Sequence, residues 1–212
     1  MRAGFRPAPG RDRVFVLPRA FLAILLAVSA APPARAAGWR GSCDSRFRGT
    51  STLHDFAGSA RCRPFAVDVE SGADGKASIG RTEVVVPVSG MDTGNGSRDR
   101  QMRRMFAGDQ FPDIRGTFGN IDPEKVRWEL RQRPEAGVPL DFTLTIRDIA
   151  RPVHAVARNF RDGGTTISFV VDYAVSLGDY GLTPPKAFFG LVRVGNEVNV
   201  TTAVRLEAAG AK

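Results

Sequence analysis

Hydrophobic and polar residues alternate with a period of two along most of the chain beyond residue 43. The clearest runs are residues 140–147 and 167–175, in which every second side chain is apolar. Because successive side chains of a strand point to opposite faces of a sheet, this alternation predicts half-buried β-strands. Val126, Trp128 and Leu130 alternate with charged residues in the same way, so we interpret them as a further strand.

Turn signals separate these runs at short intervals. Gly163-Gly164 predicts a hairpin between strands at residues 153–160 and 166–175, and Gly119-Asn120 with Asp122-Pro123-Glu124 predicts another hairpin turn. Gly195-Asn196-Glu197 predicts a final hairpin that joins residues 191–194 to 198–206, because glycine and asparagine tolerate positive φ. Many short strands without alternating long helices fit either a sandwich or a barrel, and the periodicity does not decide between them.

One segment, residues 91–118, interrupts the β pattern with a short amphipathic helix. The run Gly94-Asn95-Gly96 ends the preceding strand, and Ser97 is the expected helix cap. One face of this helix is apolar and the other is basic, with Met102, Met105 and Phe106 opposite Arg98, Arg100, Arg103 and Arg104. Such a helix can lie across the end of a β-barrel with its apolar side inward.

The first 36 residues have the composition of a secretory signal peptide. Five arginines precede an apolar run at residues 21–31, and the triplet Ala34-Arg35-Ala36 follows that run. The run is shorter than the roughly 20 residues that a membrane span needs. We therefore expect cleavage near Ala36, one domain over residues 37–212 without a transmembrane anchor, and a periplasmic or secreted location.

Removal of this segment would lower the net charge of the chain. Residues 1–36 carry +5 of the formal +8, which leaves +3 for the remainder. Arginines then alternate with acidic residues along the strands, without a basic patch interleaved with stacking aromatic rings. We therefore expect no nucleic-acid partner.

Cys43 and Cys62 are the only cysteines in the sequence. Export would place them in an oxidising compartment, so we expect one disulfide, with two unpaired buried thiols as the alternative. A disulfide that closes a loop of this length stabilises a fold by roughly 3 kcal/mol in the chain-entropy model.

Motifs for catalysis are scarce. The two histidines, His54 and His154, do not form a metal-binding pair, so we expect ordinary strand residues and no metal site. Asp92-Thr93-Gly94 matches the catalytic tripeptide of aspartic proteases, but those enzymes need two such carboxylates and the sequence holds one copy. A turn explains the tripeptide equally well. An aspartic-protease-like enzyme is therefore a remote alternative to a non-enzymatic protein.

Five stretches, in order along the chain, resemble the YceI-like family of secreted, lipocalin-like, isoprenoid-binding proteins. They are a first strand at residues 51–58, the helical segment at 91–118, a strand, turn and strand at 144–153, the segment at 175–182 and the turn at 194–198. The resemblance implies an all-β fold. In this family the fold is an antiparallel lipocalin-like β-barrel, here of about eight strands, with a short amphipathic helix near one end.

The resemblance also implies an exported carrier that binds a long-chain isoprenoid or a similar amphiphilic lipid inside the barrel. An isoprenoid quinone or a prenyl phosphate is the expected kind of ligand, and no other cofactor is expected. Arg100, Arg103 and Arg104 are candidate contacts for an anionic head group, with a solvated helix face as their alternative role. The expected pocket residues are Phe142, Leu144, Ile146, Phe169, Val171 and Tyr173 in the wall, with Met105 and Phe106 as the lid.

A packed barrel is the competing hypothesis. The chain contains 14 phenylalanines against 2 tyrosines and 2 tryptophans, and such rings fill a core as readily as they line a cavity. A barrel of about eight strands is wide enough for either arrangement. A filled barrel would be a ligand-free structural or stress-response domain of the cell envelope, whereas a hollow barrel fits transport, storage or accessory work with membrane electron carriers.

Overall fold

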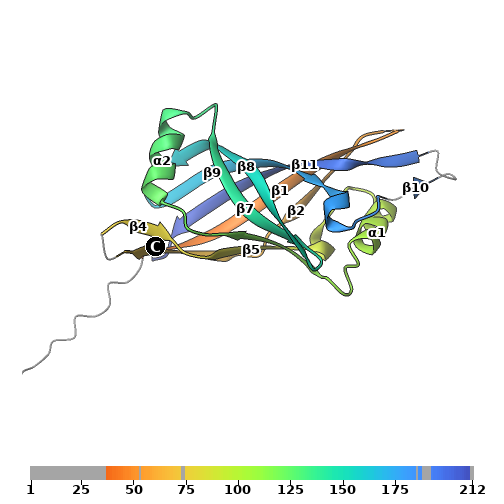
Figure 1. The fold of residues 1–212 in the computed structure, drawn as a ribbon, viewed down its shortest axis with the longest axis horizontal. Coiled ribbons are helices and arrows are strands. Elements are labelled where there is room, and N and C mark those ends of the chain that lie inside the picture. Colours follow the sequence, from red (N-terminus) through yellow and green to blue (C-terminus); the bar gives the residue numbers. More distant parts are fainter. Residues whose placement is uncertain (1–36, 53, 73–74, 185, 188–191, 211–212) are drawn as a thin grey trace, which may run out of the picture. The chain divides into compact units, whose positions relative to one another are not determined.

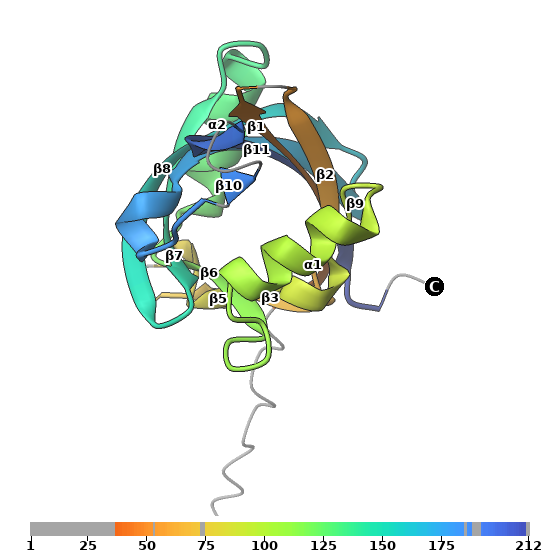
Figure 2. The same cartoon turned by 90° about the vertical axis from the view of Figure 1, so that its right-hand side faces the viewer.

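The computed structural model describes residues 37–210 except 53, 73–74, 185 and 188–191. The expected signal peptide, residues 1–36, lies outside the described residues. Within the described part, antiparallel strands wrap into a nearly closed barrel with a helix at each end, α1 and α2 (Figure 1; Figure 2). The predicted fold class is therefore correct. The prediction included one short helix, whereas the described residues form two α-helices.

The strands form one sheet in the order β4-β3-β1-β11-β9-β8-β7-β6-β5, with β2 paired to β1 and β10 paired to β11. This path is slightly longer than the predicted eight strands. The bounds are β1 (Ala37–Ser51), β2 (Phe56–Arg61), β3 (Phe65–Ser71), β4 (Ala77–Ile79), β5 (Thr82–Pro87), β6 (Asp113–Phe118), β7 (Val138–Ile146), β8 (Ile149–Asp162), β9 (Thr166–Ser176), β10 (Lys186–Ala187) and β11 (Val192–Ala208). The helices are α1 (Gly96–Met105) and α2 (Pro123–Gln132), with short 3-10 turns η1 (Val88–Gly90) and η2 (Leu177–Tyr180).

The barrel nearly closes where the chain passes from β2 to β3 beside β5. β1 pairs with β3 through its first part and with β2 through its second part. Between those two strands, the backbone N–H of Arg63 donates to the carbonyl of Val85 on β5 at 2.8 Å. The Arg63 guanidinium also binds both carboxylate oxygens of Asp113 on β6, at 2.8 and 3.0 Å. Arg63 therefore connects the two sides of the seam.

The strand predicted around Val126, Trp128 and Leu130 is wrong, because these residues lie in α2. The side chain of Asp122 accepts hydrogen bonds from the N–H groups of Glu124 and Lys125, and a proline follows the cap directly. Both features favour a helix start. Val126 and Leu130 then lie one turn apart on the same face, with Leu130 buried, while Trp128 is 63% exposed.

The predicted hairpin at Gly195-Asn196-Glu197 is also wrong, because β11 runs through these residues without a turn. Gly49 pairs with Val198, but Ser51 pairs with Val194, so the extra residues of β11 form an irregularity in the ladder. A Cβ atom on Gly195 would lie 2.4 Å from Oγ1 of Thr50. The glycine therefore permits close approach of two strands.

Some other sequence predictions are confirmed, but the first strand expected at residues 51–58 is not continuous, because His54 and Asp55 lie in a loop before β2. The hairpin turn expected at residues 119–124 leads into α2 instead of a strand. The alternating runs at 140–147 and 167–175 fall in β7 and β9, and Gly163-Gly164 forms the turn between β8 and β9. The amphipathic helix is α1, but its cap is Asn95, whose side chain accepts from the N–H groups of Ser97 and Arg98 at 3.1 Å. Ser97 is therefore the second residue of the helix and not its cap.

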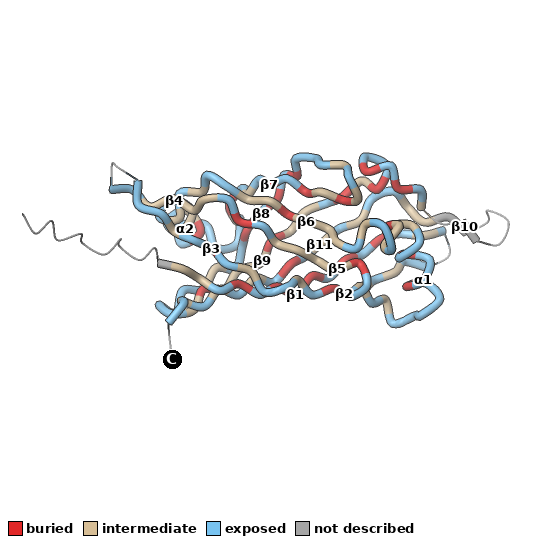
Figure 3. The backbone as a smooth tube through the Cα atoms, turned by 90° about the horizontal axis from the view of Figure 1, so that it is seen from below, coloured by how far each residue is buried: buried red, intermediate tan, exposed pale blue. Residues whose placement is uncertain are grey.

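Buried side chains form a large and a small cluster, at different depths in the barrel. Inward and outward positions alternate along the strands, which Figure 3 shows as buried segments between exposed ones. The large cluster lies from the middle of the barrel to α1, and the small one lies under α2 around Leu130, Val138 and Ala157. The expected disulfide between Cys43 and Cys62 is present, with Cα atoms 5.4 Å apart.

Candidate functional site

A cavity of about 610 Å³ occupies the α1 end of the barrel. Its wall is mainly apolar, with aliphatic side chains from β7, β9 and β11 and aromatic side chains from β1 and β2. Representative wall residues are Phe47, Phe56, Leu144, Val175, Val198 and Val200. The volume lies within the range of about 300–1,000 Å³ typical of small-molecule sites. Since a water molecule takes up about 30 Å³, the cavity has room for about twenty groups of that size.

Aromatic rings form the inner end of this cavity. The ring of Phe142 stacks on Phe118 with centroids 4.7 Å apart and meets the ring of Tyr173 edge-on at 5.2 Å. Tyr173 lines the cavity, whereas Phe142 and Phe118 lie beyond it. The barrel is therefore hollow between α1 and Tyr173 and filled by side chains beyond that level.

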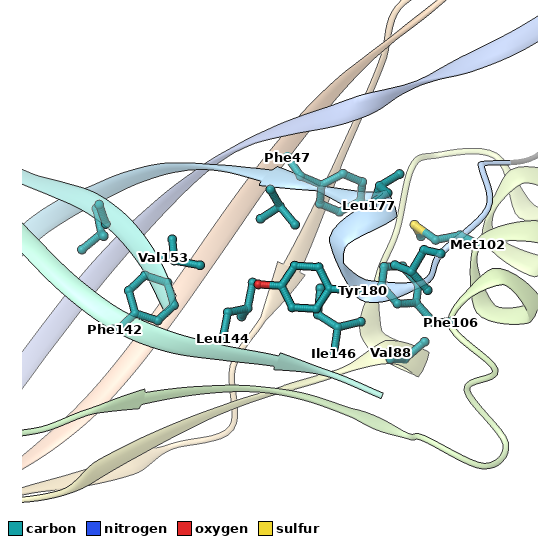
Figure 4. Close-up of a cluster of buried hydrophobic side chains, with 14 residues drawn as sticks. Phe47, Val88, Met102, Phe106, Phe142, Leu144, Ile146, Val153, Leu177 and Tyr180 are labelled. Carbon is teal, nitrogen blue, oxygen red and sulfur yellow. The ribbon is translucent and has the colours of Figure 1, made fainter. Parts of the chain in front are cut away.

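Helix α1 covers the outer end of the cavity. Its apolar face carries Met102, Met105 and Phe106, all of which line the cavity, and Figure 4 shows Met102 and Phe106 pointing toward Leu177. Arg147, in the turn between β7 and β8, donates to the backbone carbonyls of Met105 and Phe106 at the helix end. A cation at a helix C-terminus is favourable because the carbonyl groups there carry partial negative charge.

The rim beside the start of α1 is polar. It is formed by Ser51, His54, Thr93, Asn95, Arg98 and Gln101. Arg98 and Gln101 are exposed, as expected for residues at an opening. This rim offers hydrogen-bonding groups and one guanidinium beside an otherwise apolar cavity.

Asp99 fixes the loop that leads into α1. Its carboxylate accepts hydrogen bonds from the hydroxyl of Thr93 at 2.6 Å and from the Thr93 N–H at 2.9 Å. The hydroxyl bond above all, together with the N–H bond, Arg103 and Arg98, holds the pKa of Asp99 below its usual value, although burial acts in the opposite direction. The carboxylate thus stays ionised and keeps the rim in place.

Three hydroxyl groups gather at the inner end of the cavity. Ser45 and Thr202 are a directly opposed pair on β1 and β11, with their oxygens 2.9 Å apart. Tyr173, on the neighbouring strand β9, lies diagonally across from Thr202, since Thr202 pairs with Val171. Burial raises the pKa of Tyr173 to about 12, with the Thr202 hydroxyl opposing the shift and Tyr180 adding to it. The phenol is therefore neutral at physiological pH.

The structure brings five of the eight predicted pocket residues to the cavity surface. These are Met105, Phe106, Leu144, Ile146 and Tyr173. Phe142, Phe169 and Val171 are not among the lining residues and belong instead to the packed core beyond the cavity. They share the inward face of their strands with the lining residues, but they lie too far from α1.

The predicted head-group arginines lie away from the cavity. Arg100, Arg103 and Arg104 are exposed on α1, and none of them lines the cavity. Arg98, which lies nearer the start of the helix, does line the cavity. The alternation of basic residues identified the polar face but not the part of it that reaches the rim.

The other motifs noted in the sequence lie in a turn, in a loop and on an exposed strand position. The carboxylate of Asp92 accepts a hydrogen bond from the N–H of Gly94 at 2.7 Å, so Asp92-Thr93-Gly94 forms a turn. His154 is exposed on β8, where its Nδ1 lies 3.0 Å from Asp141, while His54 lies in a loop instead of a strand. No group of three potential metal ligands occurs among the described residues. The same part of the chain holds no helix with the length and hydropathy of a membrane span.

The fold and the site define a class of protein, namely β-barrels with an apolar internal cavity. The sequence model of the YceI-like domain matches residues 44–206, and the chain therefore belongs to this family. No curated protein matches the sequence.

The solved structures that share the fold include the following two. BcnA from Burkholderia cenocepacia superposes with a TM-score of 0.55 at 14% identity, over 77% of this chain and 95% of that one. A polyisoprenoid-binding domain from Saccharophagus degradans, implicated in plant cell wall breakdown, has a TM-score of 0.52 at 14% identity, over 82% of this chain and 99% of that one. At this level of identity the likeness concerns the fold alone.

Proposed function

We propose that this chain is an exported, non-enzymatic carrier that holds the chain of an isoprenoid or a similar amphiphilic lipid inside its barrel. The observation that carries the proposal is the apolar cavity of about 610 Å³ beneath α1. Native protein interiors are close-packed and contain few voids larger than a water molecule. A void of this size in a domain with a fully packed structural core would be unusual, so the cavity favours a ligand-binding role over a purely structural one.

The free energies are sufficient for a long apolar chain. Each buried methylene contributes about 0.8 kcal/mol, and association costs about 4–15 kcal/mol. Some ten to twenty buried carbon groups therefore give net binding, and the cavity has space for about that number. Membership of the YceI-like family and the polyisoprenoid-binding relative support the same class of ligand.

The polar rim suits the exposed end of an amphiphile. Arg98 and Gln101 lie at the opening, where an anionic or hydrogen-bonding group would remain in contact with water. The arginine that contacts the polar end of the ligand is then Arg98, and not Arg100, Arg103 or Arg104. An isoprenoid quinone and a prenyl phosphate both combine an apolar chain with a polar end that this arrangement accepts.

The disulfide and the composition of residues 1–36 support export of the chain. A disulfide persists in oxidising compartments such as the periplasm, and a structural pair of this kind is rare in the cytosol. The family is consistent with the same location.

Lipid transfer from vesicles tests the proposal. Purified protein is mixed with phosphatidylcholine vesicles that contain either geranylgeranyl phosphate or an isoprenoid quinone, separated by flotation and extracted. We expect close to one isoprenoid per protein for at least one of the two lipids. A protein that acquires neither lipid, under conditions in which it remains folded by circular dichroism, would contradict the proposal.

A further inference from the structure

The hydroxyl groups of Ser45, Thr202 and Tyr173 form a polar cluster at the end of an otherwise apolar cavity. Ser45 and Thr202 are both buried, and their oxygens are 2.9 Å apart. Tyr173 lies diagonally across from Thr202 on the neighbouring strand β9, since Thr202 pairs with Val171. A cavity that held only hydrocarbon would gain nothing from buried hydroxyls, because polar groups cost free energy when they lose water.

This hydroxyl cluster lies at the deepest level of the cavity. From η2 into β9 the lining residues run inward from Leu177 to Tyr173, and on β11 they run inward from Val194 to Val200, which is paired with Tyr173. On β1, Ser45 is the lining residue farthest from the rim. Three neighbouring strands therefore bring their innermost lining positions close together, and there the ring of Tyr173 meets the ring of Phe142 edge-on.

The cluster has a hydrogen-bond donor to spare. Three hydroxyls carry three protons, and the hydrogen bond between Ser45 and Thr202 uses one of them. That bond leaves the Tyr173 proton unused, and it also leaves the Ser45 proton unused when Thr202 is the donor. Both of these residues line the cavity, whereas Thr202 does not. The unused proton is thus available to an acceptor inside the cavity.

The surroundings suit a neutral acceptor. Among the described residues that line the cavity, the basic side chains are Arg98 and His54, and both belong to the rim. The inner wall beside the cluster consists of Phe47, Ala60, Leu144 and Val200. An anionic group placed there would lose its hydration without gaining a cation, which is costly.

We propose that the hydroxyl cluster binds a neutral carbonyl or hydroxyl oxygen on the end of the ligand that enters the barrel first. This inference rests on the proposed function and specifies the ligand further: an isoprenoid with an uncharged oxygen at its buried end. A prenyl phosphate bound with its phosphate at the rim would leave the cluster to an ordered water molecule, which is the competing occupant.

Matched ligands and matched variants test the inference. The probes are geranylgeranylacetone, an isoprenoid ketone, and the hydrocarbon in which a methylene replaces its carbonyl group. The variants are Tyr173→Phe and Ser45→Ala, which each remove one donor, and Arg98→Gln, which changes the rim only. A net hydrogen bond changes affinity by roughly three- to tenfold. We expect the wild type to prefer the ketone by about that factor and the double variant Ser45→Ala/Tyr173→Phe to lose the preference.

The infrared carbonyl stretch of the bound ketone provides a readout that a purely structural role would not move. We expect a lower frequency in the wild type than in hexane, a return toward the hexane value in the double variant, and no change in Arg98→Gln. Equal affinity for ketone and hydrocarbon, or a carbonyl frequency that follows Arg98→Gln, would overturn the inference while the carrier function stands. A wild type that binds neither probe would overturn both.

Discussion

Nε of Arg147 lies 3.4 Å from the backbone carbonyl oxygen of Phe106, and a second guanidinium nitrogen binds the carbonyl of Met105. These contacts connect the turn between β7 and β8 to the end of α1. Arg147 is the first residue of that two-residue turn and has a φ of 55°, which is uncommon for a residue other than glycine. The guanidinium is thus directed at the helix that covers the cavity.

We expect Arg147→Met to release bound lipid several-fold faster than the wild type. The substitution removes the hydrogen bonds to α1 and costs about 1 kcal/mol of stability. Stopped-flow transfer of a fluorescent isoprenoid to acceptor vesicles measures the release rate. Arg104→Met, which removes an exposed arginine from the same helix, is the matched control and should release lipid at the wild-type rate. Equal release rates for both variants would contradict a holding role for Arg147.

A substitution that fills the cavity should abolish lipid binding, whereas a substitution in the packed region beyond Tyr173 should lower stability. Val200 lines the cavity and is partly accessible, so Val200→Phe would occupy ligand space and abolish lipid binding with little loss of stability. Phe142 lies in the packed region, so Phe142→Ala would cost about 3–5 kcal/mol through lost packing. Denaturant unfolding and lipid transfer separate the two effects. Full lipid binding by Val200→Phe would mean that the ligand lies elsewhere.

Replacing the disulfide should affect stability and not binding. The Cys43 and Cys62 double substitution to serine removes a cross-link over a sequence separation of 19 residues, which costs roughly 3 kcal/mol. Neither cysteine lines the cavity, so the affinity for a bound isoprenoid should stay within twofold of the wild-type value at temperatures where the variant is folded. Urea unfolding with and without reductant measures the first effect. A large change in affinity would show that the cross-link shapes the cavity.

Acid should loosen the start of α1 through protonation of Asp99. The pKa of Asp99 is lower in the folded state than in the unfolded state, chiefly because of the hydroxyl bond from Thr93. Asp99 therefore stabilises the fold above its unfolded-state pKa of about 4, and that contribution is lost as the pH falls through the folded-state pKa.

We expect Asp99→Asn to be less stable than the wild type at neutral pH and to lose less stability on acidification. Urea unfolding between neutral pH and pH 3 measures both effects. Asp109→Asn, at an exposed carboxyl group beyond the helix, is the control and should behave as the wild type. Identical pH dependence in Asp99→Asn and the wild type would contradict the assigned role.

Sequence patterns predicted the fold well where the inward residues are apolar. β7 and β9 alternate clearly, and both were identified. Every second residue of β1 is buried over residues 41–49, but these inward residues include Cys43, Ser45 and Gly49. The alternation in burial therefore does not appear in the sequence as an alternation of hydrophobic and polar residues. For the same reason β1 was not recognised as a wall of the cavity.

Short sequence patterns gave wrong predictions of secondary structure where the same residues fit two periodicities. Val126 and Leu130 fit both a strand of period two and one face of a helix, and the cap at Asp122 followed by a proline was the signal that distinguishes them. At Gly195, a glycine that relieves a close approach between strands resembles a glycine that makes a turn. Only the partner strand, which is distant in sequence, distinguishes the two cases.

The depth of the cavity could not be predicted from the sequence. Phe142 and Leu144 occupy equivalent inward positions two residues apart, yet only Leu144 lines the cavity. The difference depends on Phe118 and Tyr173, which pack against Phe142 from β6 and β9. Such packing across strands has no local pattern.

Native mass spectrometry of the protein, isolated from its own host without detergent, tests lipid carriage most directly. We expect a mass above that of the polypeptide by one lipid molecule, which organic extraction removes and identifies as an isoprenoid. An unloaded protein, with a crystal structure in which side chains fill the space between α1 and Tyr173, would contradict the proposed function.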